Sequence, residues 1–367
     1  MWSDVSQKRF RPKPRRKDPS PVMLRPAIQA MNGYVPGEQP KGDDIVKLNT
    51  NENPYPHSPK AVAAMEAVLR SDRLRKYPEP MGDTFRRAAG KTLGVDPEAI
   101  LIGNGSDDVL TVLTRAFVPE GGLIASLTPS YLLYKTLAEI QGARFEGVPF
   151  AAGWQLPNPW PLPGANLTFV ANPNSPSGTA VSNADLERLA GQLQGPLVVD
   201  EAYADFAETN ALELAQRLPN VIVTRTLSKS YSLAGLRFGF AVTAPKLVSE
   251  LNKVKDSYNC DMLSLAGAAA AIEDQTYLHS QRQKILATRQ RLAEGLRALG
   301  FDVLPSQANF VWATRRDRPV QPIFAELKRK NLLVRYMNYV GFGDGIRVTV
   351  GTDAEIDRLL GELQRIG

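Results

Sequence analysis

The segment TLSKSYSLAGLRFG (residues 226–239) places Lys229 between hydroxyl groups and Arg237 eight residues later. The apolar residues 221–223 just before it predict a buried strand. The polar groups therefore follow the carboxyl end of a strand, where open α/β sheets bind ligands. A lysine amine can form a Schiff base with an aldehyde, and an arginine can bind a phosphate through two hydrogen bonds. An exposed surface lysine is the alternative, and the other motifs decide between the two.

Three further polar loops follow predicted strands. In NGSDD, Gly105 and Ser106 precede a predicted helix, whose free backbone N–H groups can hold a phosphate. In ANPNSPSGT (residues 171–179) the density of asparagine and proline predicts a fixed turn. In VVDEAYADF, Asp200 ends an apolar run, so it is expected at the inner end of a buried strand. A buried carboxylate needs a partner, and a protonated heterocyclic nitrogen would serve.

These residues meet the three needs of pyridoxal phosphate (PLP), which are a Schiff-base lysine, an acid beside the pyridine nitrogen and a phosphate site. Lys229 would supply the first and Asp200 the second. The phosphate site would combine polar groups from separate loops: Ser106, Ser228 and Arg237. With two histidines and one cysteine, the chain has no cluster of soft ligands, so no metal site is predicted.

Composition narrows the function classes. The 367 residues are 43% hydrophobic, which predicts a packed core in one large or two domains. No apolar run reaches 18 residues, so no membrane helix is expected. The single cysteine excludes an internal disulfide and fits a reducing compartment, and we expect a cytoplasmic protein.

Net charge is +6, and seven lysines and arginines lie in residues 7–21, a proline-rich segment typical of a disordered tail. Such a tail can contact nucleic acid. The remaining charges nearly balance, however, so the folded body is expected to bind neither nucleic acid nor membrane.

The order of predicted elements indicates the architecture. Strands and helices alternate from about residue 58 to residue 254, which favours a mostly parallel sheet covered by helices. A long helix at 277–300 then leads to further strands and helices, which indicates a smaller α+β domain. Thr352 and Glu355 have capping-box spacing at the start of the last helix.

Together these motifs resemble the fold type I, PLP-dependent aminotransferases. The matching segments, which run in family order from about residue 34 to residue 352, are LNTNENPY, RKYPEP, GNGSDD, TPSYLLY, NPNSPSGT, VVDEAYADF, TLSKSYSLAGLRFGF and GIRVTVGT. The resemblance implies a large domain with a mostly parallel seven-stranded sheet and a smaller α+β domain. The implied division is a basic disordered tail (1–29), an arm joining the small domain (30–47), a large PLP-binding domain (48–262) and a small C-terminal domain (263–367).

The resemblance also implies roles in binding PLP. Lys229 would hold the cofactor and move the proton, Asp200 would pair with the pyridine nitrogen, and Tyr203 would bond the ring oxygen O3′. Tyr131 would stack on the ring. The other expected cofactor contacts are Gly105, Ser106, Asp107, Asn174, Ser228 and Arg237. Where the family has asparagine before Pro-x-Gly this chain has Ser175, so the contact to O3′ is open between Ser175 and its neighbour Asn174.

The motifs are most similar to the branch of this family that exchanges an amino group between histidinol phosphate (or imidazole acetol phosphate) and 2-oxoglutarate (or glutamate) in histidine synthesis. The implied substrate-binding residues are Tyr34, Asn51, Arg335 and Arg347. An arginine accepts both carboxylate and phosphate as a bidentate fork, so one arginine can serve both substrates. Tyr55 would reach the cofactor of a partner subunit, which implies a homodimer.

Other functions remain open at this point. A threonine-phosphate decarboxylase or an aromatic amino-acid aminotransferase on the same fold would carry similar motifs. A nucleic-acid-binding protein that acts through the basic tail is the remote alternative.

Overall fold

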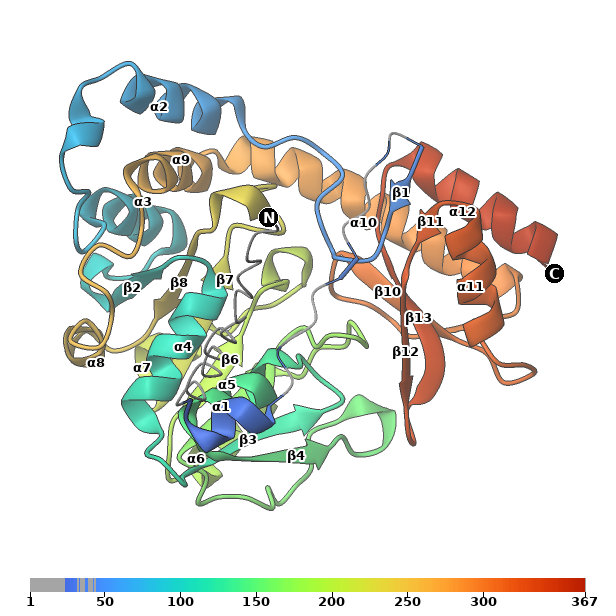
Figure 1. Ribbon diagram of the computed structural model, residues 1–367, viewed down its shortest axis with the longest axis horizontal. Coiled ribbons are helices and arrows are strands. Elements are labelled where there is room, and N and C mark those ends of the chain that lie inside the picture. Colours follow the sequence, from blue (N-terminus) through green and yellow to red (C-terminus); the bar gives the residue numbers. More distant parts are fainter. Residues whose placement is uncertain (1–23, 32, 34–36, 39–41, 43, 367) are drawn as a thin grey trace, which may run out of the picture.

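The computed structural model describes residues 24–31, 33, 37–38, 42 and 44–366 of the chain. The described part forms a large α/β domain and a smaller α+β domain side by side (Figure 1). In the described residues, no helix has the length and apolar character needed to cross a membrane. The predicted tail, residues 1–29, lies outside the described residues up to residue 23, and a short helix, α1 (Pro26–Ala30), includes its last four residues.

A seven-stranded sheet forms the centre of the large domain. Its strand order is β2-β8-β7-β6-β5-β3-β4, and all strands run parallel except β8, which is antiparallel to both neighbours. This confirms the predicted mostly parallel, seven-stranded sheet. The strands are β2 (Ile100–Gly103), β3 (Leu123–Thr128), β4 (Arg144–Pro149), β5 (Leu167–Ala171), β6 (Leu197–Asp200), β7 (Val221–Thr226) and β8 (Gly239–Val242).

Helices cover both faces of this sheet, because its central strands are apolar on both sides. In β6, Val198 packs on one face, whereas Leu197 and Val199 pack on the other. The first face is covered by α4 (Ser106–Phe117), α5 (Leu133–Gln141) and α8 (Pro245–Leu251). The second face is covered by α3 (Asp83–Leu93), α6 (Asn183–Gln192), α7 (Leu212–Arg217) and α9 (Met262–Glu273), and α2 (Pro59–Leu69) packs on α9.

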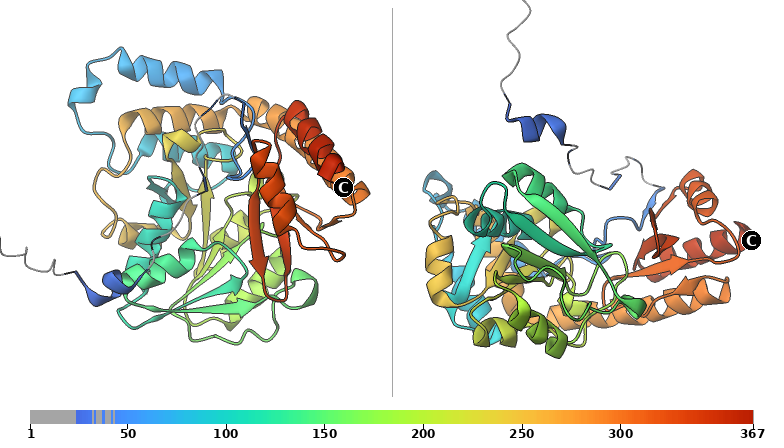
Figure 2. Two further views of the ribbon diagram at one scale, coloured as in Figure 1. Left: turned by 45° about the vertical axis from the view of Figure 1, so that its right-hand side comes forward. Right: turned by 90° about the horizontal axis from the view of Figure 1, so that it is seen from below.

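The small domain has its own sheet and its own apolar core. Its strand order is β12-β13-β10-β9, with antiparallel pairs throughout. A two-stranded parallel sheet, β1 with β11, joins the N-terminal arm to this domain (Figure 2). The elements are β1 (Val46–Lys47), α10 (Gln275–Ala298), β9 (Asp302–Val303), β10 (Phe310–Thr314), α11 (Gln321–Arg329), β11 (Leu332–Leu333), β12 (Arg335–Tyr339), β13 (Gly343–Thr349) and α12 (Asp353–Ile366).

The two cores meet where α9 is followed by α10. Helix α9 contributes Leu265 and Ala268 to the core of the large sheet, whereas α10 contributes Ile285 and Leu292 to the core of the small domain. The predicted boundary between residues 262 and 263 stays a prediction, and α9 packs with the large domain although it begins at that boundary.

The last helix begins as its sequence predicts. The Thr352 N–H donates to Glu355 Oε2 at 2.7 Å, and the Glu355 N–H donates to Thr352 Oγ1 at 3.3 Å. These reciprocal bonds form the predicted capping box ahead of α12.

Candidate active site

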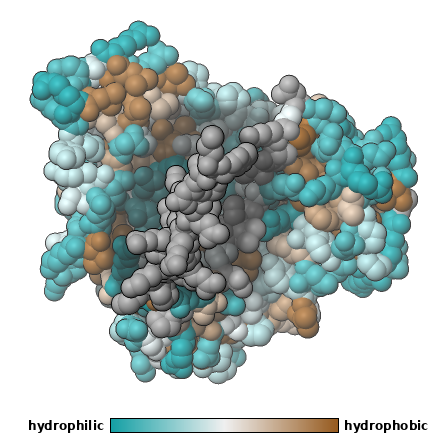
Figure 3. All heavy atoms as spheres, in the orientation of Figure 1, coloured by the Kyte–Doolittle hydropathy of each residue, from teal (hydrophilic) through white to brown (hydrophobic). Residues whose placement is uncertain are grey.

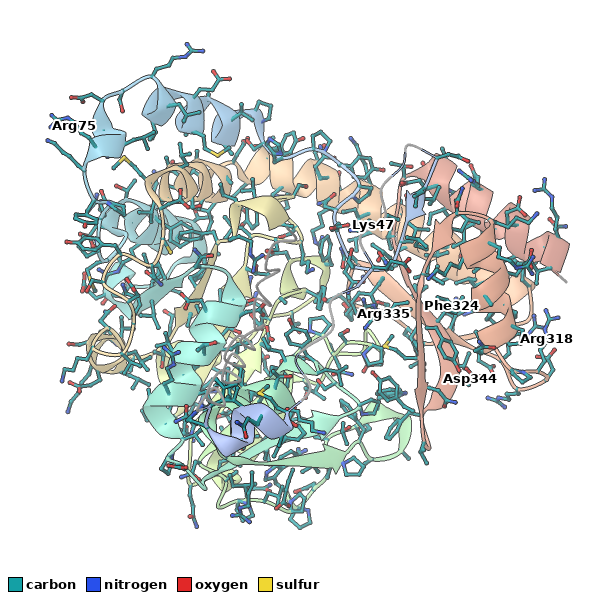
Figure 4. All side chains as sticks on the ribbon, viewed as in Figure 1. Lys47, Arg75, Arg318, Phe324, Arg335 and Asp344 are labelled. Carbon is teal, nitrogen blue, oxygen red and sulfur yellow. The ribbon has the colours of Figure 1, made fainter. Side chains whose placement is uncertain are left out.

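A cleft of about 380 Å³ lies where the carboxyl ends of the central large-domain strands face β12 and β13 of the small domain. The structure brings eleven of the predicted residues to its walls: Asn51, Ser106, Asp107, Tyr131, Asp200, Tyr203, Ser228, Lys229, Arg237, Arg335 and Arg347. Figure 4 shows Arg335 on β12, at the edge of the small domain that faces the large domain. The sequence positions of these residues are far apart, so the fold alone assembles the set.

Lys229 lies in the loop after β7, and two neutral groups, the Thr50 carbonyl and the Tyr203 ring, lie near its amine. Its Nζ donates to the Thr50 carbonyl at 3.3 Å and lies 5.9 Å from the centre of the Tyr203 ring. The Tyr203 phenol oxygen in turn accepts a hydrogen bond from Asn51 Nδ2 at 2.9 Å. Asn51 adopts a left-handed φ of 57°, and its backbone N–H donates to Thr349 Oγ1 at 3.0 Å. A small-domain strand therefore helps to hold the polar wall beside the lysine.

Asp200 ends β6 and is buried at the floor of the cleft, with 5% of its surface exposed. Its Oδ2 accepts from the Tyr134 phenol at 2.8 Å, and its Oδ1 accepts from Thr224 Oγ1 at 3.3 Å. The Ala202 N–H also donates to Oδ1, at 3.3 Å. Burial raises the pKa of Asp200 from 3.8 to about 6, while the hydrogen bond from Tyr134 opposes that rise.

The partners of this carboxylate are all neutral. Among the described residues, Asp200 forms no ion pair with a lysine or an arginine. Taking a carboxylate out of water is costly unless a cation compensates its charge. Asp200 is therefore suited to pair with a cationic group of a ligand in the cleft.

An anion site lies at the N-terminus of α4. Ser106 is the first residue of this helix, and Gly105 caps it with a φ of 85°. A Cβ atom on Gly105 would lie 2.5 Å from Arg237 Nη2, so glycine lets the guanidinium approach the helix end. Arg237 Nη1 also donates to Ser228 Oγ at 3.5 Å. Free helix N–H groups, two hydroxyls and a guanidinium together suit a phosphate.

Asp107 and Tyr131 connect this anion site to the rest of the cleft. The Tyr131 phenol donates to Asp107 Oδ1 at 3.2 Å, and Asp107 Oδ2 lies 4.0 Å from Arg237 Nη2. Tyr131 lies in the turn between β3 and α5, so its ring lines the cleft beside the start of α4.

A second group of cations lies on the small-domain wall. Arg335 and Arg347 stand opposite each other in the antiparallel pair β12–β13, so their side chains share one face of that sheet. Arg347 Nη1 donates to Ser175 Oγ at 2.8 Å, and its Nη2 donates to the Asn49 carbonyl at 2.9 Å. Two neighbouring guanidinium groups suit the carboxylate or phosphate of a substrate.

Four predicted residues are not among the described residues that line the cleft. Tyr34 lies outside the described residues. Gly105 acts through the close approach of Arg237 described above. Asn174 is buried, and its amide bonds Ser130 Oγ, the Pro129 carbonyl and Ser177 Oγ. Its neighbour Ser175 does line the cleft, so the open choice between them now favours Ser175 by position, and the contact itself stays a prediction.

Tyr55 packs against the small domain of its own chain. Lys284 Nζ of α10 lies 5.0 Å from the centre of the Tyr55 ring. The predicted role of Tyr55 in a partner subunit stays a prediction.

Several residues of the site were not predicted from the sequence, namely Thr50, Ser130, Met337 and Tyr339 on the walls and Tyr134, which contacts Asp200. Tyr134 gave no local signal of this contact, because TPSYLLY predicts it only as an apolar residue of a helix. Arg335, Met337 and Tyr339 follow one another at intervals of two residues along β12. The two-residue period of a strand would therefore have placed all three on one face.

Comparison with known proteins agrees with this geometry. The family model for class I and II aminotransferases matches residues 43–363. The histidinol-phosphate aminotransferase of Rhodopirellula baltica is 50% identical over 350 residues, which cover 94% of this chain and 96% of that protein. The enzyme of the same name from Syntrophotalea carbinolica is 46% identical over 345 residues, which cover 94% of this chain and 99% of that protein.

A solved structure shows the same likeness. The histidinol-phosphate aminotransferase of Sinorhizobium meliloti, solved in complex with pyridoxal-5′-phosphate, superposes with a TM-score of 0.84 at 26% identity. The match covers 94% of this chain and 97% of that chain. The fold is therefore that of the PLP-dependent aminotransferases, as the sequence motifs predict.

Proposed function

The chain belongs to the class I and II aminotransferase family, and on this premise we propose that it is a PLP-dependent transaminase acting on histidinol phosphate. The reaction exchanges the amino group of histidinol phosphate with 2-oxoglutarate, giving imidazole acetol phosphate and glutamate in histidine synthesis. The choice of substrate rests on relatives of that name at 44–50% identity over more than nine-tenths of the chain.

The residues of the cleft fit the cofactor. The buried carboxylate of Asp200 has only neutral hydrogen-bond donors among the described residues, so a protonated pyridine nitrogen would compensate its charge. Ser106, Ser228 and Arg237 would hold the phosphate at the N-terminus of α4. When bound, PLP supplies an aldehyde for the amino-group exchange and a ring that accepts the electron pair as the substrate C–H bond breaks.

The chain's own residues then have separate tasks. Lys229 attaches the cofactor and, once released, accepts and returns the substrate proton at its Nζ. Asp200 keeps the ring nitrogen protonated, because an ionised carboxylate favours a neighbouring cation. Tyr203 is held by Asn51 so that its phenol faces the cleft as a donor. Tyr131 covers the ring, and its bond to Asp107 fixes its orientation.

Arg335 and Arg347 are proposed to bind the far end of either substrate. The tetrahedral phosphate of histidinol phosphate and the planar distal carboxylate of glutamate each present two oxygens that a guanidinium fork can bond at once. The two arginines stand opposite each other on β12 and β13, so the same wall can receive both anions in turn.

The observation that carries the proposal is the placement of Lys229 and Asp200 after neighbouring strands, in one cleft with an anion site at α4. The test is to incubate the purified protein with PLP, 2-oxoglutarate and one amine at a time, and to measure glutamate and carbon dioxide. Histidinol phosphate is expected to give glutamate at the highest kcat/KM. Faster turnover of an aromatic amino acid, or carbon dioxide release from threonine phosphate, would overturn the substrate assignment.

A homodimer is also part of the proposal. Leu69, Leu74 and Tyr77 are each more than half exposed, and an apolar group is visible over α2 in Figure 3. Exposed apolar groups of this kind are typical of an interaction surface, and a second copy of the chain would cover them. Tyr55 is proposed to act across that interface, and a cytoplasmic location stays a prediction.

A further inference from the structure

The phenol of Tyr134 forms a hydrogen bond with the carboxylate of Asp200. The phenol lies on α5 and is fully buried, and it donates to Asp200 Oδ2 at 2.8 Å. Burial together with the negative charge of Asp200 raises the pKa of Tyr134 far above its usual value. The phenol therefore keeps its proton and remains a donor at every working pH.

Packing alone does not explain a tyrosine at this position. The ring of Tyr134 stacks on Phe169 with a centroid distance of 4.6 Å and an angle of 8°, and it meets the Tyr131 ring edge-on at 5.6 Å. A phenylalanine would make the same ring contacts. A buried hydroxyl costs free energy unless it is hydrogen-bonded, and the bond to Asp200 meets that need.

The same ring contacts fix the direction in which the hydroxyl points. Phe169 lies on β5, two residues before Ala171, which is paired with Asp200 of β6. The Phe169 ring that stacks on Tyr134 therefore belongs to β5, the strand beside the carboxylate. The contacts with Phe169 and Tyr131 hold the ring of Tyr134 in place, so its hydroxyl stays within hydrogen-bond distance of Asp200 Oδ2.

We propose that Tyr134 is a positioning residue for the cofactor, because its phenol orients the Asp200 carboxylate and holds it in the ionised form that pairs with the pyridine nitrogen. The inference rests on the proposed function and adds a residue to it. The other hydrogen bonds to this carboxylate come from Thr224 and the Ala202 N–H at 3.3 Å, so Tyr134 makes the shortest one.

The charge state of Asp200 is set by groups on several elements. Asp107 of α4 opposes its ionisation, whereas hydrogen bonds from Tyr134, Thr224 and the Ala202 N–H favour it. The other titratable or charged groups that line the cleft are Glu52, Tyr131, Tyr203, Lys229, Arg237, Arg335, Tyr339 and Arg347. Tyr134 donates directly to the carboxylate, whereas the Tyr131 phenol donates to Asp107 and the Tyr203 phenol accepts from Asn51.

The test compares the PLP affinity of the cofactor-free wild type and of the Tyr134→Phe variant from pH 8.5 to pH 6, by titration followed in the absorbance of bound PLP. Without the phenol, Asp200 is expected to protonate at a higher pH, by one to two units if the lost bond is typical of those to charged groups. The ratio of the two dissociation constants then stays near one at pH 8.5 and rises roughly five- to fifty-fold by pH 6. Titration of free PLP cancels in this ratio.

Two further variants make the test decisive. Tyr231→Phe removes another phenol hydroxyl, which accepts from Gln275 Nε2 at 3.2 Å and does not touch Asp200, so its ratio is expected to stay flat with pH. Thr224→Val removes a weaker donor to the same carboxylate, so its ratio is expected to rise by less than that of Tyr134→Phe.

A ratio for Tyr134→Phe that is independent of pH would mean a purely structural role and would overturn the inference. If that variant does not fold, a flat ratio for Thr224→Val would overturn it instead. A wild-type protein that fails to bind PLP at any pH would overturn the proposed function, and this inference with it.

Discussion

Replacing Asp200 with asparagine is expected to stabilise the cofactor-free protein above pH 6 while it removes the charge that the proposed reaction needs. Asp200 is buried, and its hydrogen bonds come from neutral donors. Asparagine has nearly the same shape, and its amide oxygen can accept the short bond from Tyr134, so only the two longer bonds to Oδ1, at 3.3 Å, lose their acceptor. It brings no charge into the core, so the substitution separates the cost of the buried charge from the packing around it.

The size of the effect follows from the titration of Asp200. Burial raises its pKa from 3.8 to about 6. A rise of two units at about 1.4 kcal/mol per unit means that ionised Asp200 destabilises the cofactor-free fold by roughly 3 kcal/mol. The pKa of Asp200 is higher in the folded than in the unfolded protein. The wild type is therefore not destabilised by this group below about pH 4, and it loses the roughly 3 kcal/mol as the pH rises to about 6. Asparagine does not titrate, so the stability of Asp200→Asn relative to the wild type increases between about pH 4 and pH 6 and is constant above that range.

The assay is thermal unfolding of both cofactor-free proteins at pH 4.5 and pH 8. With an unfolding entropy of about 2.1 cal/mol/K per residue, roughly 3 kcal/mol corresponds to a Tm higher by roughly 4 °C at pH 8. Saturating PLP should reverse the order, because the wild type binds it more tightly and gains more. A control is Glu201→Gln. Glu201 is also buried but pairs with Arg225 at 2.7 Å, so this variant should lose stability.

The reasoning would be refuted by an Asp200→Asn protein that melts at or below the wild type at pH 8. It would also be refuted by a difference of equal size at pH 4.5 and pH 8, since a titrating group cannot give a constant offset across its own pKa.

Three shorter predictions test the rest of the site. Lys229→Ala should still bind PLP but lose the borohydride-reducible attachment and nearly all turnover, and a reduced adduct on another lysine, located by mass spectrometry, would contradict the assignment. Arg335→Ala should lower kcat/KM about ten- to a hundred-fold for histidinol phosphate and less for glutamate, whereas Arg347→Ala should lower both. Equal losses for both substrates with Arg335→Ala would argue against a phosphate contact. Inactive Tyr55→Ala and Lys229→Ala proteins should regain activity when mixed, and subunit exchange without recovery would exclude a role of Tyr55 across the interface.

The cofactor side of the cleft was predictable because each residue follows its own strand. Asp200 ends the apolar run of β6, and Lys229 follows β7, which pairs with β6 in parallel. The carboxyl ends of neighbouring parallel strands meet at one edge, so local patterns were enough to bring these two residues together. Ser106 was predictable for a similar reason, because a glycine before a helix marks its free N-terminus.

Tyr134 shows what local patterns leave out. Its sequence context predicts an apolar core residue of a helix, and the stacking of its ring on Phe169 agrees with that prediction. Its hydroxyl contacts a carboxylate 66 residues away in the chain, and only the strand order β6-β5-β3 brings α5 above that carboxylate. The adjacent pair Asn174 and Ser175 shows the same limit, since the turn decides which of them faces the cleft.

The wall proposed to bind the substrate is even harder to predict from local sequence patterns, because residues of both domains form it. Arg347 of β13 donates to Ser175, 172 residues away, and to the Asn49 carbonyl, 298 residues away. No periodicity in the sequence sets such distances, and the family resemblance alone pointed to this arginine. These two bonds also tie the small-domain wall to the large-domain loop and to the segment after β1. The proposed substrate contacts therefore depend on how the domains pack, whereas most of the proposed cofactor contacts, including Asp200, Ser106 and Arg237, lie in the large domain. We expect substrate preference to vary with substitutions between the domains more readily than cofactor binding does.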